Sequence, residues 1–215
     1  MTSCICARCC ATGSDKVRYV ALAVVLLVLG GMLWGSGAHA ETWIYRLDPQ
    51  ATEVRFVLDA TMHKVRGSAV LERGEIRFDG ESGAAEGEVV VDATSMETGN
   101  AKRDRDMHQK VLDSEEFPEI VLTVSGFEGD FDPAAPSEVV VDARLRIHGA
   151  EHPLRLEMSL EPRDGRLAAT TTFVVPYVEW GMENPSRLFL RVAKEVSVTI
   201  AAVGVLDEGN GSGNS

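Results

Sequence analysis

Residues 138–148 read EVVVDARLRIH, and this stretch decides the fold class because apolar and polar positions alternate along it. Its odd-numbered positions are Val139, Val141, Ala143, Leu145 and Ile147, and the polar side chains between them are Asp142, Arg144 and Arg146. Successive side chains of a β-strand point to opposite faces, so this period of two residues is typical of a strand with one buried face. We therefore predict a strand here, with its odd-numbered side chains in the core.

The same period continues outward in both directions, from Trp43 to Gly204. TEVRFVLDA (52–60) places Phe56 and Leu58 on one apolar face, and HPLRLEMSLEP (152–162) has a similar face of four apolar side chains. Further strands are predicted near residues 43–48, 68–80, 86–94, 119–127, 166–175 and 187–203, separated by turn-forming residues. No repeat or linker divides this part of the sequence, so we expect one all-β domain over residues 41–206.

The period alone leaves two architectures open. Long antiparallel strands with one apolar face suit a closed barrel or a sandwich of two sheets. A barrel of about eight strands can hold one small ligand, whereas a sandwich packs small side chains without a void. The candidate inward faces are mostly Val, Leu, Ala and Thr, and aromatic residues are 6% of the chain. Such small side chains favour an enclosed apolar cavity but do not exclude a sandwich.

The first forty residues have the pattern of a secretory signal. Arg8, Lys16 and Arg18 precede an apolar run over residues 20–33, and the small residues of 38–40, Ala-His-Ala, follow. This order predicts cleavage after Ala40 and a periplasmic or secreted protein. The alternative is an uncleaved anchor, but the run is shorter than the roughly 20 residues that cross a bilayer. All four cysteines precede the predicted cleavage site.

Charge narrows the classes of partner. The chain has a formal net charge of −12, and loss of residues 1–40, with three basic and one acidic side chain, makes it −14. This acidity disfavours nucleic acid and anionic membrane surfaces as partners. No later apolar run approaches membrane-spanning length, so we expect no integral membrane segment after cleavage. Residues 207–215, DEGNGSGNS, are predicted to form a disordered tail.

Residues 97–120, ETGNAKRDRDMHQKVLDSEEFPEI, interrupt the strand pattern with a dense group of charges. Asn100 is a predicted N-cap, and a helix of two or three turns is predicted from Arg103 to Leu112. Asp104 with His108, and Asp106 with Lys110, are spaced to pair across one helical turn. This pattern predicts a lid helix over a barrel mouth, with its charges facing water.

Catalysis and metal binding are the alternatives for this segment. Asp104 and His108 have the residue types of a general base and its orienting carboxylate, and four histidines, His63, His108, His148 and His152, follow the predicted signal. No serine or cysteine lies in a recognisable nucleophile elbow. His148 and His152 have helical spacing, but Gly149 and Pro153 break a helix there. We therefore predict no catalytic residue and no metal ligand.

Four blocks of the sequence, in their order and spacing, resemble the YceI-like family of secreted bacterial proteins that are regarded as polyisoprenoid-binding. The blocks are YRLDPQATEVRFVLDATMHKVRG (45–67), TSMETGNAKRDRDMHQKVLDSEEFPEIVLTV (94–124), ARLRIHGAEHPL (143–154) and VPYVEWGMENPSRLFLRVAKEVSVTI (175–200). The resemblance covers about residues 43–204. One departure is Ala69, which stands two residues after Gly67 where the family usually has an aromatic residue.

The resemblance implies an extended lipocalin-like antiparallel β-barrel with a short helix over one mouth. Its pore would hold a long isoprenoid or similar amphipathic, quinone-like lipid, without catalysis and without a catalytic cofactor. The expected ligand contacts are Phe56, Leu58, Leu122, Val141, Leu145 and Phe173 in the wall, and Arg103 and His108 at the mouth. Oligomeric state stays open, a homodimer included. The alternative functions are a solidly packed envelope interaction or stress domain and, less favoured, a hydrolase or metal enzyme that uses Asp104, His108 and His63.

Overall fold

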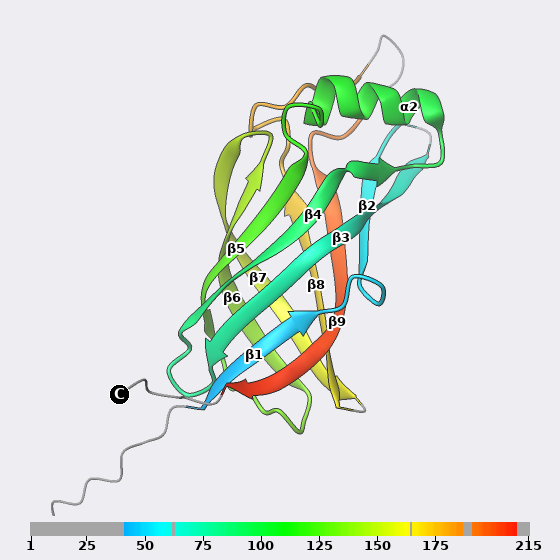
Figure 1. The fold of residues 1–215 in the computed structure, drawn as a ribbon. Helices are drawn as coiled ribbons and strands as arrows, with labels where there is room; N and C mark the ends of the chain where they lie inside the picture. The colour runs from blue at the N-terminus through cyan, green and yellow to red at the C-terminus, as the bar shows by residue number, and fades with distance from the viewer. Residues whose placement is uncertain (1–40, 62, 164, 187–190, 210–215) are drawn as a thin grey trace, which may run out of the picture. The chain divides into compact units, whose positions relative to one another are not determined.

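The computed structural model describes residues 41–61, 63–163, 165–186 and 191–209, and the predicted signal segment 1–40 lies outside the described residues. Within these ranges the chain forms nine strands and a short helical segment (Figure 1). The strands are β1 (Thr42–Leu47), β2 (Glu53–Asp59), β3 (Lys64–Asp79), β4 (Ala85–Glu97), β5 (Glu119–Glu128), β6 (Ser137–Ile147), β7 (Ala150–Arg163), β8 (Arg166–Val175) and β9 (Val196–Gly209). The helical segment consists of α2 (Ala101–Asp106) and the π-helical η1 (Met107–Leu112).

The strands form a closed antiparallel barrel, which confirms the barrel interpretation over the sandwich. Each strand from β3 to β9 pairs with the next along the chain, and β9 then pairs with both β1 and β2. β1 and β2 also both pair with β3, at opposite ends of that long strand. The two short strands therefore lie end to end and share one position, so the barrel has eight positions around its circumference.

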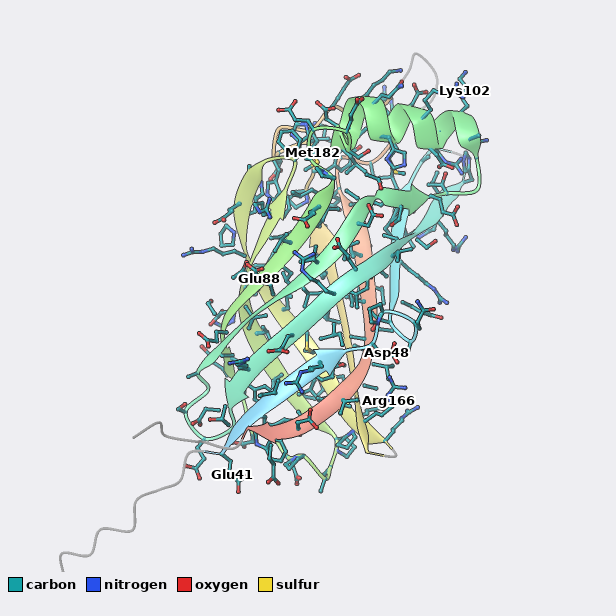
Figure 2. All side chains as sticks on the ribbon, viewed as in Figure 1. Glu41, Asp48, Glu88, Lys102, Arg166 and Met182 are labelled. Carbon is teal, nitrogen blue, oxygen red and sulfur yellow. The ribbon has the colours of Figure 1, made fainter. Side chains whose placement is uncertain are left out.

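The break between β1 and β2 contains Pro49, which has no N–H to donate to a sheet ladder. Hydrogen bonds and an ion pair hold this turn on both sides of Pro49. Asp48 Oδ1 accepts a hydrogen bond from the Gln50 amide at 2.9 Å, and the Asp48 carboxylate pairs with Arg166 of β8 (Figure 2). Thr52 Oγ1 accepts a hydrogen bond from the Val203 amide at 3.2 Å. These contacts keep β1 and β2 aligned although the ladder is interrupted.

Aromatic side chains gather at the end of the barrel away from α2, and we call this group the floor. It consists of Trp43, Phe78, Phe127 and Phe131. The Phe78 ring lies edge-on to Phe131, with centroids 4.9 Å apart, and to Phe127 at 5.7 Å. Trp43 contacts Phe131 in the same manner at 5.9 Å. Edge-to-face contacts of this kind are favourable beyond the area that they bury.

The last strand, predicted near residues 187–203, begins and ends later in the structure, so that it includes residues 207–209 of the predicted tail. Residues 191–195 make an isolated bridge from Val192 to Ala60, and β9 begins at Val196. This segment bonds instead to the end of β2, where the Ala193 amide donates to Asp59 O at 2.8 Å. β9 then continues through residues 207–209, which pair with Thr42–Ile44 of β1. Residues 187–190 and 210–215, also covered by these predictions, lie outside the described residues.

Candidate functional site

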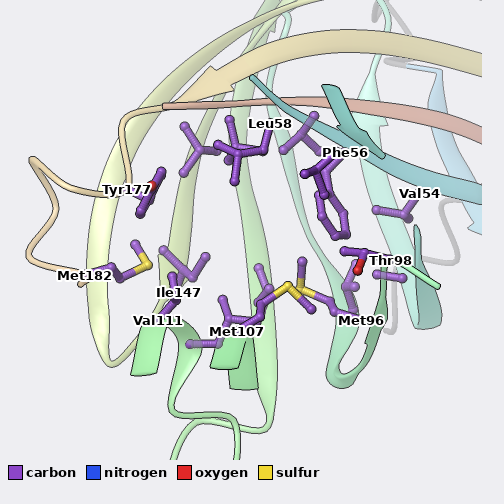
Figure 3. Close-up of a pocket in the computed structure, with 18 of the residues that line it drawn as sticks. Val54, Phe56, Leu58, Met96, Thr98, Met107, Val111, Ile147, Tyr177 and Met182 are labelled. Atoms are coloured by element: carbon purple, nitrogen blue, oxygen red, sulfur yellow. The ribbon is translucent and has the colours of Figure 1, made fainter. Parts of the chain in front are cut away.

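A cavity of about 440 Å³ lies inside the barrel at the end covered by α2 and η1. Its wall comes from β2, β3, β4, β5, β6, β8 and β9, and apolar side chains dominate it. Figure 3 shows ten labelled lining residues: Val54, Phe56, Leu58, Met96, Thr98, Met107, Val111, Ile147, Tyr177 and Met182. A volume of this size falls within the roughly 300–1,000 Å³ range of small-molecule sites.

Phe56 shapes one side of the cavity because its ring lies across the neighbouring strand. Phe56 pairs with Gly67 of β3, and a Cβ atom at Gly67 would lie 2.2 Å from Cζ of the ring. Gly67 therefore provides the space that the ring occupies. Two residues later, Ala69 pairs with Val54 and lines the cavity with a single methyl group. A larger side chain at Ala69 would project into the pore beside Phe56.

Polar side chains gather at the end of the cavity near α2, and we call this group the mouth. It consists of His63, Thr98, Asn100, Lys102, Arg103 and Asp106. His63, Asn100 and Lys102 are exposed, so the cavity reaches solvent here. Asp106 pairs with Lys110 one helical turn later, as the sequence predicts. The site therefore combines an apolar chamber with a polar opening that contains both basic and acidic groups.

Thr98, directly after β4, fixes the helix on the mouth. Asn100 caps α2 as predicted, with Oδ1 accepting from the amides of Lys102 and Arg103. Arg103 Nε donates to Thr98 Oγ1 at 2.7 Å, and Arg103 Nη2 donates to Thr98 O at 3.0 Å. The Thr98 hydroxyl donates to Asp104, whose Oδ1 also accepts from the Thr98 amide at 3.0 Å. Thr98 thus orients both Arg103 and Asp104.

Replacing Thr98 with valine should test this network, since the substitution removes the hydroxyl and keeps the shape. We expect the free energy of unfolding to fall by about 1–2 kcal/mol, because Arg103 and Asp104 each lose a partner in a partly buried site. Chemical denaturation followed by circular dichroism measures the change. Thr94→Val is the matched control, because the Thr94 side chain is exposed and its hydroxyl bonds to Asp92 on its own strand. The free energy of unfolding of Thr94→Val should stay within about 0.5 kcal/mol of the parent. Equal losses of stability in the two valine variants would contradict the role of Thr98.

His108 anchors the second half of the helical segment. One of its ring nitrogens, Nε2, bonds to Met96 O at 2.9 Å, and the other, Nδ1, bonds to Ser114 Oγ at 2.8 Å. η1 ends at Asp113, whose φ of 46° is left-handed, a conformation that aspartate tolerates better than most residues. The turns of η1 bring Met107 and Val111 over the cavity. π-helical turns often occur at functional sites.

The comparison with known proteins agrees with this geometry. A family model described as YceI-like domain matches residues 45–203, which run from β1 into β9. The chain belongs to the YceI-like family. Among solved structures, it is similar to a polyisoprenoid binding domain from Saccharophagus degradans implicated in plant cell wall breakdown, with a TM-score of 0.61 and 18% identity over 76% of this chain and 98% of that one.

A second neighbour in fold is BcnA from Burkholderia cenocepacia. The TM-score is 0.59, with 14% identity over 73% of this chain and 98% of BcnA. At such low sequence identities, the similarity to these two structures establishes that the chain shares their fold. No curated protein matches the sequence at a significant level.

The structure of this YceI-like barrel brings most of the predicted site residues together. Six of the eight line the cavity: Phe56, Leu58, Leu122, Leu145, Phe173 and Arg103. Val141 lies deeper and lines a second, smaller cavity. His108 lines neither cavity, because both ring nitrogens bond within the helical segment. The predicted pairing of His108 with Asp104 is wrong, since Asp104 bonds to Thr98.

The predicted ligand contacts did not include any residue of the segment after β8, although three of its side chains line the pore. Tyr177, Met182 and Pro185 lie in the segment after β8 and face the cavity. The Tyr177 hydroxyl donates to Ala193 O at 2.7 Å, and burial raises the pKa of this phenol. The nearby Trp180 stacks on His152 with ring centroids 3.9 Å apart. Because this segment has no regular period, the sequence carried no signal for which of its side chains point inward.

Two further findings apply to the described part of the YceI-like chain. There, no three side chains among His, Cys, Asp and Glu gather closely enough to hold a metal ion. No helix in the same ranges is both long and apolar enough to cross a membrane.

Proposed function

We propose that this YceI-like protein binds an isoprenoid-type or similar amphipathic lipid, with its chain in the cavity and its head group at the mouth. The observation that carries the proposal is a 440 Å³ apolar chamber that opens to solvent through a polar rim. Burial of a hydrocarbon chain gains about 25 cal/mol for each Å² of apolar surface removed from water. Such a chain needs no hydrogen-bond partner, which suits a wall of Val, Leu, Ile, Phe and Met side chains.

Lys102 and Arg103 are the donors that we assign to the head group. Arg103 keeps N–H groups beyond the two that bond to Thr98, and a guanidinium group suits phosphate or carbonyl oxygen. Lys102 is exposed at the same opening. We do not assign His108 to the head group, because its ring already holds Met96 and Ser114.

We further propose that the protein acts without catalysis, as a lipid carrier or store in the periplasm or outside the cell. The predicted secretory signal supports this location. Asp104 and His108, two of the three residues of the hydrolase alternative, each bond to other groups. The alternative of a solidly packed interaction domain predicts no internal cavity, whereas the barrel contains one. The similar fold of the polyisoprenoid binding domain from Saccharophagus degradans also favours a lipid ligand.

Identification of the lipid that copurifies with the native protein tests the proposal. The variant Ala69→Phe tests in addition whether this lipid occupies the cavity. The phenyl ring would fill part of the chamber, and displacing two methylene groups costs about 0.8 kcal/mol each. We therefore expect Ala69→Phe to retain about tenfold less lipid than the parent by mass spectrometry of extracts. Val70→Phe is the matched control, because Val70 is adjacent in β3 but points outward and is 57% exposed.

Val70→Phe should retain the parent amount of lipid. Parent protein that carries no isoprenoid or comparable lipid, or equal retention by the two phenylalanine variants, would contradict the proposed function.

A further inference from the structure

The pore continues below the main cavity into a second chamber. This lower cavity has a volume of about 90 Å³, and its lining includes Ala169, Leu160 and Phe127. Three residues line both cavities: Val89, Leu122 and Ile200. The two spaces therefore adjoin, and the shared side chains form the boundary between them.

The boundary is a narrowing made by opposite walls of the barrel. Val89 of β4 and Leu122 of β5 are cross-strand partners, so their side chains lie together on one wall. Ile200 belongs to β9, which lies four positions from β5 in the eight-position ring and is therefore opposite to it. Branched side chains from both walls therefore line the boundary, and a hydrocarbon chain must pass between them to go deeper.

The lower chamber ends at the floor. Phe78, Phe127 and Phe131 line it, and the Phe78 ring lies edge to face against the other two. Trp43 contacts the Phe131 ring edge-on. Because aromatic rings cover this end, a chain that enters through the mouth stops at the floor.

We infer that the pore selects lipids by chain length, with the narrowing and the floor setting the upper limit. This inference rests on the proposed function. A cavity of about 150 Å³ holds one benzene molecule, so 440 Å³ accommodates roughly eighteen carbon atoms, and the lower chamber adds only a few more. The ligand class is therefore an amphipathic lipid with one chain of roughly fifteen to twenty carbons. A longer polyisoprenoid leaves part of its chain in water.

Prenyl alcohols of increasing length test the inference on delipidated protein. Geraniol, farnesol, geranylgeraniol and solanesol form a series that differs in the number of isoprene units. Each buried methylene raises affinity about fourfold, so affinity should rise at least tenfold from geraniol to farnesol and rise again to geranylgeraniol. Solanesol should bind no more tightly than geranylgeraniol, because its additional units find no space.

Ala169→Leu tests whether the lower chamber takes the end of the chain. Ala169 is 4% exposed, lines the lower cavity and does not line the upper one. The larger side chain should lower affinity for geranylgeraniol about tenfold and leave geraniol unchanged, since it displaces about two methylene groups. Ala168→Leu is the control, with the same change on the outward face of β8. If Ala169→Leu does not fold, Phe131→Ala gives the opposite test: it opens the floor, and solanesol should then bind more tightly than to the parent.

The outcomes separate the inference from the proposed function. Affinity that keeps rising through solanesol in the parent would overturn the chain-length limit and leave lipid binding intact. Equal losses for all four alcohols in Ala169→Leu would do the same. Failure of every alcohol to bind the parent would overturn the proposed function, and the inference with it.

Discussion

Gly204→Ala should destabilise the barrel by about 3 kcal/mol or more, because it places a methyl group where β1 and β9 meet. A Cβ atom at Gly204 would lie 2.1 Å from the carbonyl oxygen of Arg46 and 2.7 Å from the Tyr45 ring. Gly204 pairs with Leu47 on one side and Leu167 on the other. The carbonyl of Arg46 belongs to the backbone of β1, so relief of the clash requires the strand itself to move.

Urea denaturation followed by circular dichroism measures this loss as a lower midpoint. Gly126→Ala in β5 is the control, because the nearest atom to its Cβ would be Gly83 O at 3.6 Å, an ordinary contact. We expect that variant to stay within about 1 kcal/mol of the parent. If the two alanine variants have the same stability, close approach at Gly204 does not constrain the closure of the barrel.

Strand positions and inward faces could be predicted from the sequence because they are local properties. Residues 138–148 alternate in the sequence, and the structure buries Val139, Val141, Ala143, Leu145 and Ile147 as predicted. Five of the six predicted site residues that line the main cavity do so for the same reason, and the sixth, Arg103, belongs to α2. The capped helix over one mouth was also predictable, since Asn100 and the loss of the two-residue period mark its start. It begins at Ala101, two positions before the predicted Arg103.

The remaining features depend on contacts between distant parts of the chain, and no local pattern encodes them. His108 bonds to Met96 O, which precedes it by twelve residues at the end of another element. Val141 faces inward as predicted but lies below the narrowing, because depth in the pore follows from strand register rather than from period. The start of the last strand was predicted too early because residues 191–195 bond to the end of β2, a contact between distant parts of the chain.

Whether a barrel is hollow is a further property that sequence alone could not decide. Alternation shows which side chains point inward, but the space left between them depends on how far apart the walls stand. Opposite walls carry Leu122 and Ile200 at the narrowing, where both side chains line the boundary between the two cavities. Above them, small side chains such as Ala69 leave the chamber open. The size of the cavity thus depends on pairs of residues that lie on opposite walls and are far apart in the sequence.

The second large effect concerns pH, and it arises from Tyr45. This side chain is 5% exposed, and its hydroxyl donates to Leu167 O at 3.1 Å. Burial raises the pKa of the Tyr45 phenol well above its usual range, and the nearby Arg166 lowers it by a smaller amount. Above about pH 10 the unfolded chain loses the phenol proton while the folded chain keeps it. Stability contributed by this group is therefore complete below about pH 10 and falls as pH rises, by about 1.4 kcal/mol per pH unit.

Comparison of the parent with Tyr45→Phe isolates this contribution from other groups that titrate at high pH, Tyr177 included. Near neutral pH the variant should be less stable by about 1 kcal/mol, because Leu167 O loses its partner. Between about pH 10 and pH 12 the parent should lose about 2–3 kcal/mol more than the variant, so that their order of stability reverses. Denaturant unfolding at a series of pH values measures both curves. A difference that stays constant from about pH 8 to pH 12 would show that the Tyr45 phenol ionises alike in the folded and unfolded chains, and that the barrel wall around it admits water.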